Sequence, residues 1–134
     1  MKAIRIIICC CLLVFTQQGV KAQSKAEIKQ AKHLFDGYWF NQQAKRFLFI
    51  TIENNGEVLI NDWTGSFKKR GHADAYKAHI KGSTLQMPGA EDDHHAPDCE
   101  MLIKNKRLLF QCKGLLTHTN DFVDKTFFTR LKPQ

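Results

Sequence analysis

The sequence predicts an all-β protein, a small antiparallel barrel or sandwich preceded by one short N-terminal helix. Two observations carry this prediction. Strand-like runs recur about every twelve residues after the first quarter of the chain, which is the spacing of a sandwich or barrel. Tight-turn signals such as Asn54-Asn55-Gly56 separate these runs. The segments between the runs are too short for the crossover helices that a parallel sheet needs.

Residues 1–22 have the pattern of a secretory signal peptide. A basic start is followed by an unbroken apolar run from Ile6 to Phe15 and then by Val20-Lys21-Ala22, which fits a cleavage site. The apolar run is too short to span a bilayer, because a membrane-spanning helix needs about 20 residues. We therefore expect residues 23–134 to form one exported domain, periplasmic or secreted, with no transmembrane segment.

The charge and the motifs exclude several classes of function. The formal net charge is +7. Three of the basic residues (Lys2, Arg5 and Lys21) lie in the leader, so the exported domain carries a charge of about +4. Its basic residues are scattered and do not alternate with aromatic ones, so we expect no nucleic-acid binding. No nucleophile elbow, paired catalytic carboxylates or cofactor motif is found, so we expect neither catalysis nor a cofactor.

The first element after the leader is a helix. Ser24-Lys25-Ala26-Glu27 fits a capping box, and Ile28, Ala31 and Phe35 follow at helical spacing. These residues predict a helix over 25–34. About nine short strands are then expected from the alternation of apolar residues and the positions of the turn residues. They span residues 38–42, 46–53, 57–61, 66–70, 75–81, 83–87, 99–104, 107–112 and 125–131.

Two cysteines remain after the leader, and their spacing predicts a disulfide. If Asn105-Lys106 is the two-residue loop of a hairpin, Cys99 falls opposite Cys112 in a non-hydrogen-bonded pair. Such pairs bring the Cα atoms to about 4.5 Å, close enough for a disulfide. The same register places Met101 and Phe110 on the cysteine face. There is no Cys-x-x-Cys motif, so we interpret the bridge as structural rather than redox-active.

The start of the domain resembles that of a lipocalin-like (calycin) β-barrel protein of the bacterial cell envelope. The resemblance lies in the predicted helix followed by Phe35-Asp36-Gly37-Tyr38-Trp39. In that superfamily a Gly-x-Trp opens the first strand, and a basic residue near the end of the last strand lies across the tryptophan. Arg130 is placed to do this. The resemblance implies a small closed barrel with Trp39 and Arg130 at its closure, and it implies binding of one small ligand inside.

The strand at 46–53 is apolar on both faces, with Phe47 and Phe49 on one face and Leu48, Ile50 and Ile52 on the other. We expect one face to line the interior and the other to be covered by the helix, by a partner, or to be an exposed patch. The same apolar residues fit a filled core or a ligand pocket. The predicted lining residues are Phe47, Phe49, Leu59, Tyr76, Met87, Met101 and Phe110.

Two functions are expected from these patterns. The first is a carrier that binds a small hydrophobic molecule inside the barrel. The alternative is a protein-binding module, such as a periplasmic inhibitor of a lytic enzyme. A third feature, the loop at 91–98, holds the weak metal candidates His94 and His95. Neighbouring side chains of an extended loop point in opposite directions, which favours a solvated loop over a metal site.

Overall fold

The computed structural model describes residues 22–89, 96–114 and 121–132, and within them one helix precedes eight strands. Every neighbouring pair of strands is antiparallel, and pairing of the first with the last closes the barrel. The predicted all-β barrel with a short N-terminal helix is therefore confirmed. The leader at 1–22 lies almost wholly outside the described residues and stays a prediction. The elements are α1 (Lys25–Phe35), β1 (Gly37–Asn41), β2 (Arg46–Ile52), β3 (Val58–Gly65), β4 (Arg70–Lys81), β5 (Thr84–Met87), β6 (Cys99–Lys104), β7 (Arg107–Lys113) and β8 (Phe122–Arg130).

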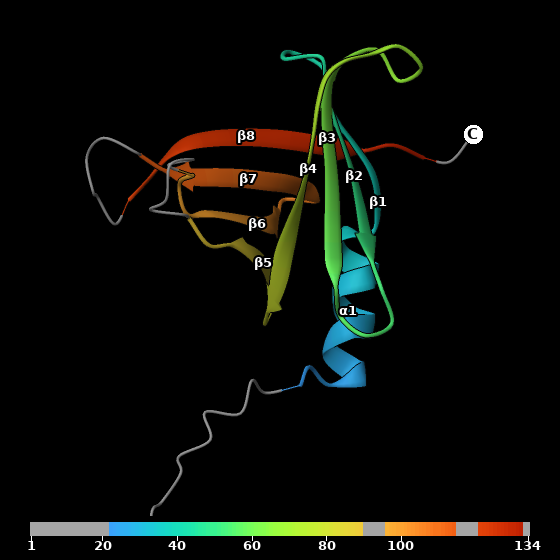
Figure 1. Cartoon of the computed structure of the whole chain (residues 1–134), viewed down its shortest axis with the longest axis vertical. Coiled ribbons are helices and arrows are strands. Elements are labelled where there is room, and N and C mark those ends of the chain that lie inside the picture. Colours follow the sequence, from blue (N-terminus) through green and yellow to red (C-terminus); the bar gives the residue numbers. More distant parts are fainter. Residues whose placement is uncertain (1–21, 90–95, 115–120, 133–134) are drawn as a thin grey trace, which may run out of the picture.

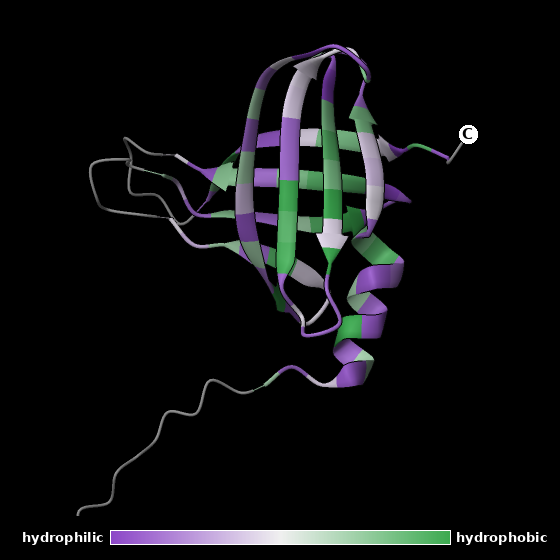
Figure 2. Ribbon diagram, turned by 45° about the vertical axis from the view of Figure 1, so that its right-hand side comes forward, coloured by the Kyte–Doolittle hydropathy of each residue, from purple (hydrophilic) through white to green (hydrophobic). Residues whose placement is uncertain are grey.

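The barrel is flattened into two layers whose strands run crosswise, with β1–β4 in one layer and β5–β8 in the other (Figure 1). We call the end of β1–β4 that holds the turns at 42–45 and 66–69 the upper end. The lower end holds α1 and the turns at 53–57 and 82–83 (Figure 2). Among the described residues, no helix is long and apolar enough to cross a membrane.

Helix α1 begins at the predicted capping box and packs against the lower end of the barrel. Ser24 Oγ accepts a hydrogen bond from Glu27 N at 3.2 Å, and Glu27 Oε2 accepts one from Ser24 N at 2.9 Å. Ile28, Ala31 and Phe35 are buried among residues of the barrel core. The helix thus ends one residue later than predicted, because Phe35 still belongs to its buried face.

Several expected strand boundaries were wrong, and the described residues form eight strands where about nine were expected. Residues 62–65 were expected to form a turn, but they continue β3, and the expected strands at 66–70 and 75–81 become a turn and the single strand β4. The reason lies in Asp62, whose carboxylate is bound by side chains inside the barrel rather than by a turn. The chain reverses instead at Ser66, whose Oγ accepts a hydrogen bond from Lys69 N at 2.9 Å.

The predicted hairpin and its disulfide are confirmed. Asn105 and Lys106 form the loop with φ of 52° and 62°, which defines a type I′ turn. Cys99 lies opposite Cys112 at a Cα–Cα distance of 4.1 Å, and their sulfurs are bonded. The bridge therefore ties β6 to β7.

The core fills the barrel interior from α1 upward. Because side chains alternate along a strand, one set of residues points inward, and these residues form one packed cluster with the buried face of α1. Its most deeply buried side chains are Phe35, Trp39, Leu48, Ile50, Val58, Ile60, Leu85, Met101, Leu108 and Phe128. This part of the barrel is a solid core.

Candidate functional site

The barrel closes at Trp39 and Arg130, which pair across β1 and β8. The guanidinium carbon of Arg130 lies 4.4 Å from the centre of the Trp39 ring. Arg130 also donates hydrogen bonds to the carbonyls of Asp36, His33 and Leu34 at 2.6, 3.3 and 2.5 Å, around the carboxyl end of α1. The site is structural, because it satisfies helix carbonyls that have no partner within the helix.

Three of the predicted lining residues point outward. The register pairs Leu48 with Trp39, so Phe47 and Phe49 lie on the opposite face of β2. Leu59 shares this outer face and is 43% exposed. The prediction that these three side chains line the interior is therefore corrected by the strand register.

The other four predicted lining residues point inward but contribute mostly to the core. Met101 is fully buried, and Met87 and Phe110 are each 8% exposed. Tyr76 is half-buried and faces Ile60 across β3 and β4. Of the predicted set, Tyr76 belongs to a polar cluster that the sequence did not reveal, and Phe110 lies beside it.

This cluster joins Arg46, Asp62 and Tyr76 in the upper part of the interior. Arg46 Nε lies 2.9 Å from Asp62 Oδ1, and its Nη2 lies 2.5 Å from Oδ2. The Tyr76 hydroxyl donates to Asp62 Oδ2 at 2.8 Å. The guanidinium carbon of Arg46 lies 5.1 Å from the ring centre of Phe110 and 5.6 Å from that of Phe128. An ion pair with a phenol thus lies on top of the apolar core.

The environment of the cluster shifts two pKa values. The hydrogen bond from Arg46 to Asp62 raises the pKa of the guanidinium, against the opposing effect of burial. Burial raises the pKa of the Tyr76 hydroxyl, and the negative charge of Asp62 adds to the increase. Arg46 therefore stays positively charged beside Asp62, and Tyr76 stays protonated as a hydrogen-bond donor. Solvent reaches the cluster, since the side chain of Arg46 is 29% exposed and that of Asp62 is 11% exposed.

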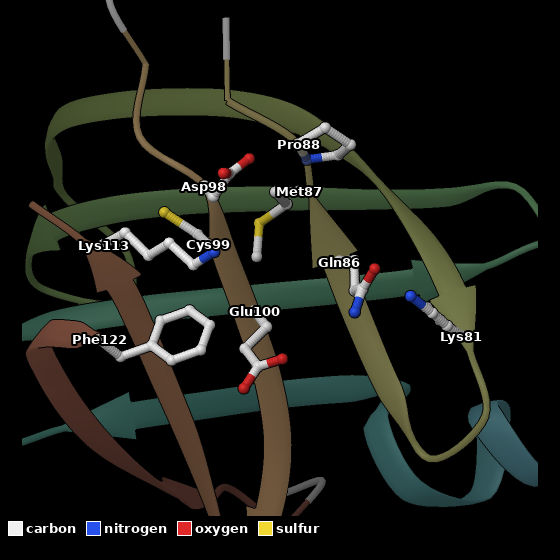
Figure 3. A pocket seen from close by; sticks show the side chains of 9 residues that line it. All are labelled: Lys81, Gln86, Met87, Pro88, Asp98, Cys99, Glu100, Lys113 and Phe122. Carbon is white, nitrogen blue, oxygen red and sulfur yellow. The ribbon is translucent and has the colours of Figure 1, made fainter. Parts of the chain in front are cut away.

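A second feature is a hollow over β5 and β6 (Figure 3), which has a volume of about 320 Å³. Both carboxylates in its lining already have partners in the chain. Asp98 Oδ1 accepts a hydrogen bond from Gly89 N at 2.6 Å, and Glu100 Oε1 accepts one from Gln111 Nε2 at 2.6 Å. The hollow is lined by Lys81, Gln86, Met87, Pro88, Asp98, Cys99, Glu100, Lys113 and Phe122. This mixed polar lining does not fit an apolar ligand.

A third feature is a group of aromatic rings on the outside of β1–β3. Tyr38 stacks on Phe49 with 4.2 Å between ring centres, and Phe47 stacks on Trp63 at 5.4 Å. Phe67, from the turn after β3, folds back so that its ring centre lies 5.1 Å from that of Tyr38. We call this group the outer aromatic wall; its members are Tyr38, Phe40, Phe47, Phe49, Trp63 and Phe67.

The metal candidates His94 and His95 lie outside the described residues. Within residues 22–89, 96–114 and 121–132, no group of three or more His, Cys, Asp or Glu side chains is arranged to hold a metal ion.

Comparison with protein-family models, with curated proteins and with solved structures gives no significant match. The fold itself, a closed antiparallel barrel of eight strands that follows a short helix, is consistent with a lipocalin-like protein. Such a barrel is compatible with binding either a small ligand or a protein.

Proposed function

We propose that this protein is an exported, lipocalin-like binding protein rather than an enzyme, and that its ligand is a small amphipathic molecule. The ligand enters the upper part of the barrel interior and places a hydrogen-bond-accepting group against Arg46. Its apolar part lies against Tyr76 and Phe110. The cell-envelope location rests on the leader pattern and is supported by the Cys99–Cys112 bridge, which suits an oxidising compartment.

The Arg46–Asp62 ion pair at inward-facing positions is the observation that supports this proposal. Removing charges from water is costly, and well-packed apolar side chains at the same positions are often equally or more stabilising. A protein that needed only a stable barrel would gain little from this pair. Arginine has five N–H donors, and the two contacts with Asp62 leave others to bind an acceptor on a ligand.

The core restricts how far a ligand can enter. Phe128 below the cluster is fully buried and Phe110 nearly so, and the buried side chains beneath them pack against α1. A long acyl chain running the length of the barrel would have to displace this core. The proposed ligand is therefore shorter and more polar than the purely hydrophobic molecule expected from the sequence.

The proposal is tested by titration with 1-anilinonaphthalene-8-sulfonate, a fluorescent probe with an apolar body and an anionic end. The folded protein is expected to bind it saturably. The double variant Arg46→Met/Asp62→Asn, which leaves no unpaired charge, is expected to weaken binding about tenfold or more. Arg107→Met serves as the matched control, because Arg107 lies over Phe127 on the outer surface. Equal affinity in the double variant, or no saturable binding by the wild type, would contradict the proposal.

The alternative expected from the sequence is a protein-binding module, such as a periplasmic inhibitor of a lytic enzyme. A different surface supports this alternative. The outer aromatic wall exposes Phe67 to 47% and adjoins Leu59, which is 43% exposed. Exposed apolar groups gathered on one face are typical of an interaction surface.

A further inference from the structure

The hollow over β5 and β6 brings hydrogen-bond donors and acceptors together (Figure 3). Gln86 and Glu100 lie opposite each other across these two strands. Lys81 ends β4 and Lys113 ends β7, and both residues line the hollow. Within the part of the chain that the structure describes, neither ammonium group forms an ion pair. Both lysines can therefore donate hydrogen bonds to a ligand.

The two carboxylates of the hollow are held in place, and each keeps one oxygen for a ligand. Asp98 Oδ1 accepts from Gly89 N, and Glu100 Oε1 accepts from Gln111 Nε2, both at 2.6 Å. The second oxygen of each carboxylate has no hydrogen-bond partner among the described residues. Cys99, which lies between the two acidic residues in the chain, is joined to β7 by the disulfide. Acceptors that are already fixed lose little conformational freedom when a ligand binds.

The hollow also has an apolar part and a limited size. Its apolar surface comes from Met87, Pro88, Cys99 and Phe122. The Phe122 ring is half-buried, and its centre lies 5.7 Å from Lys113 Nζ. The volume of about 320 Å³ is at the small end of the range for ligand pockets, which is about 300–1,000 Å³. A ligand of one or two small rings, with an apolar face and a polar rim, fits this space.

The charges around the hollow cancel. Its lining contains two basic and two acidic residues, which are Lys81, Lys113, Asp98 and Glu100. Just beyond the lining, Lys125 lies opposite Gln111 on β8 and Asp121 directly precedes that strand, so these two charges also balance. The hollow therefore selects neither an anion nor a cation by its net charge. A hydroxyl group both donates and accepts, so a neutral molecule with several hydroxyls can bind the ammonium, amide and carboxylate groups together.

The hollow lies on the outside of the barrel. Gln86 and Glu100 alternate along their strands with Leu85 and Met101, whose side chains are fully buried in the core. They therefore point away from the interior, where Arg46 and its partners lie. A molecule in the hollow does not compete for the interior site of the proposed ligand.

We infer that this hollow is a binding site for a small neutral sugar of one or two rings. The sugar hydroxyls bind Gln86, Glu100 and Lys113, and the C–H face of the ring lies against the apolar surface beside Phe122. The inference is independent of the proposed function, because it concerns a different face of the barrel and a different class of ligand.

The test is a titration of the isotope-labelled, oxidised protein followed by nuclear magnetic resonance. The probes are glucose, galactose, mannose, N-acetylglucosamine and the disaccharide maltose. At least one of them is expected to cause saturable chemical-shift changes at the backbone amides of Gln86, Glu100 and Lys113. Glucuronate and glucosamine, which add a negative or a positive charge to a similar ring, are expected to bind no more tightly, because the charges of the lining cancel.

The double variant Lys113→Met/Glu100→Gln keeps the net charge and an acceptor for Gln111. It is expected to weaken sugar binding about tenfold or more, because hydrogen bonds to two charged groups are lost. Gln86→Ala is a second, single change in the hollow and is expected to weaken binding several-fold. The matched control is Lys77→Met/Glu57→Gln, which makes the same changes at exposed positions of the other layer and is expected to leave the affinity unchanged.

Three outcomes overturn the inference. The first is the absence of saturable binding by all five neutral sugars. The second is an affinity that neither the double variant nor Gln86→Ala reduces. The third is tighter binding of glucuronate or glucosamine than of every neutral sugar. Arg46→Met/Asp62→Asn is expected to leave sugar binding unchanged, so this result and the probe titration of the interior site succeed or fail separately.

Discussion

The guanidinium of Arg130 covers the indole of Trp39 and at the same time binds the carboxyl end of α1. The guanidinium carbon lies 4.4 Å from the centre of the indole ring. Arg130 also donates hydrogen bonds to the carbonyls of Asp36, His33 and Leu34. The indole Nε1 itself donates to Phe35 O at 2.8 Å. One pair of side chains thus joins the first strand, the last strand and the helix that covers the lower end.

The first prediction concerns this junction. Arg130→Ala is expected to lower the free energy of unfolding by about 1–2 kcal/mol, because it removes a cation–π contact and charge-assisted hydrogen bonds that are partly screened by solvent. Arg130→Lys is expected to recover only part of the loss, because an ammonium group lacks the planar fork of the guanidinium. Urea unfolding measures both variants.

Arg107→Ala is the matched control for that series. Arg107 also lies over an aromatic ring, that of Phe127 at 4.9 Å, but it is exposed at the start of β7. Its loss is expected to change stability by a few tenths of a kcal/mol. If Arg130→Ala lowers the free energy of unfolding no more than Arg107→Ala does, the contacts of Arg130 with the helix contribute nothing to stability.

The second prediction concerns the Cys99–Cys112 bridge. The cysteines are separated by 13 residues in sequence, and closing a loop of this size stabilises a folded chain by roughly 3 kcal/mol. The variant Cys99→Ala/Cys112→Ala is therefore expected to unfold at a clearly lower urea concentration. Reductant is expected to destabilise the wild type similarly and to leave the variant unchanged. Equal midpoints for the oxidised wild type and the variant would refute the prediction.

The third prediction concerns Tyr76 and high pH. Burial and Asp62 hold the pKa of Tyr76 above its ordinary value of 10.0. In the unfolded chain this tyrosine loses its proton near pH 10, whereas in the folded protein it keeps it. The contribution of Tyr76 to the free energy of unfolding is therefore fully present below about pH 10 and is lost as the pH rises further.

Unfolding midpoints measured between about pH 9 and 11 test this sign. The wild type is expected to lose more stability over the range than Tyr76→Phe. Tyr38→Phe is the control, because Tyr38 lies on the outer wall and its loss leaves Tyr76 in place. If Tyr76→Phe keeps the full pH dependence of the wild type, the phenol does not account for it.

The sequence predicted the features that depend on local rules or on the family resemblance. The capping box at Ser24 and the paired cysteines at 99 and 112 follow from residue spacing alone, and Trp39 with Arg130 follows from the lipocalin-like pattern. In each case a short stretch of chain, or two positions fixed by the fold, determined the contact.

Prediction from the sequence failed where the residue pattern fitted either face of a strand, or fitted a turn as well as a strand. Strand β2 is apolar on both sides, so alternation alone could not decide that Leu48 points inward and Phe49 outward. The register settles this by pairing Leu48 with Trp39. Asp62 followed by Trp63-Thr64-Gly65 is typical of a turn. Its contact with Arg46, sixteen residues away, becomes visible only when β2 is paired with β3 from the turn at Gly56.

The fourth prediction concerns the β6–β7 turn, where Lys106 is poorly matched to the backbone. Lys106 has φ of 62°, in the left-handed region that favours glycine, and it follows Asn105 at 52°. Lys106→Gly creates the Asn-Gly pair preferred in type I′ turns and is expected to raise the free energy of unfolding by about 0.5–1 kcal/mol. Lys106→Ala is the control, since alanine has the same steric conflict at positive φ. If Lys106→Gly unfolds at no higher a temperature than Lys106→Ala, the result contradicts the turn geometry. It then also contradicts the register that aligns the two cysteines.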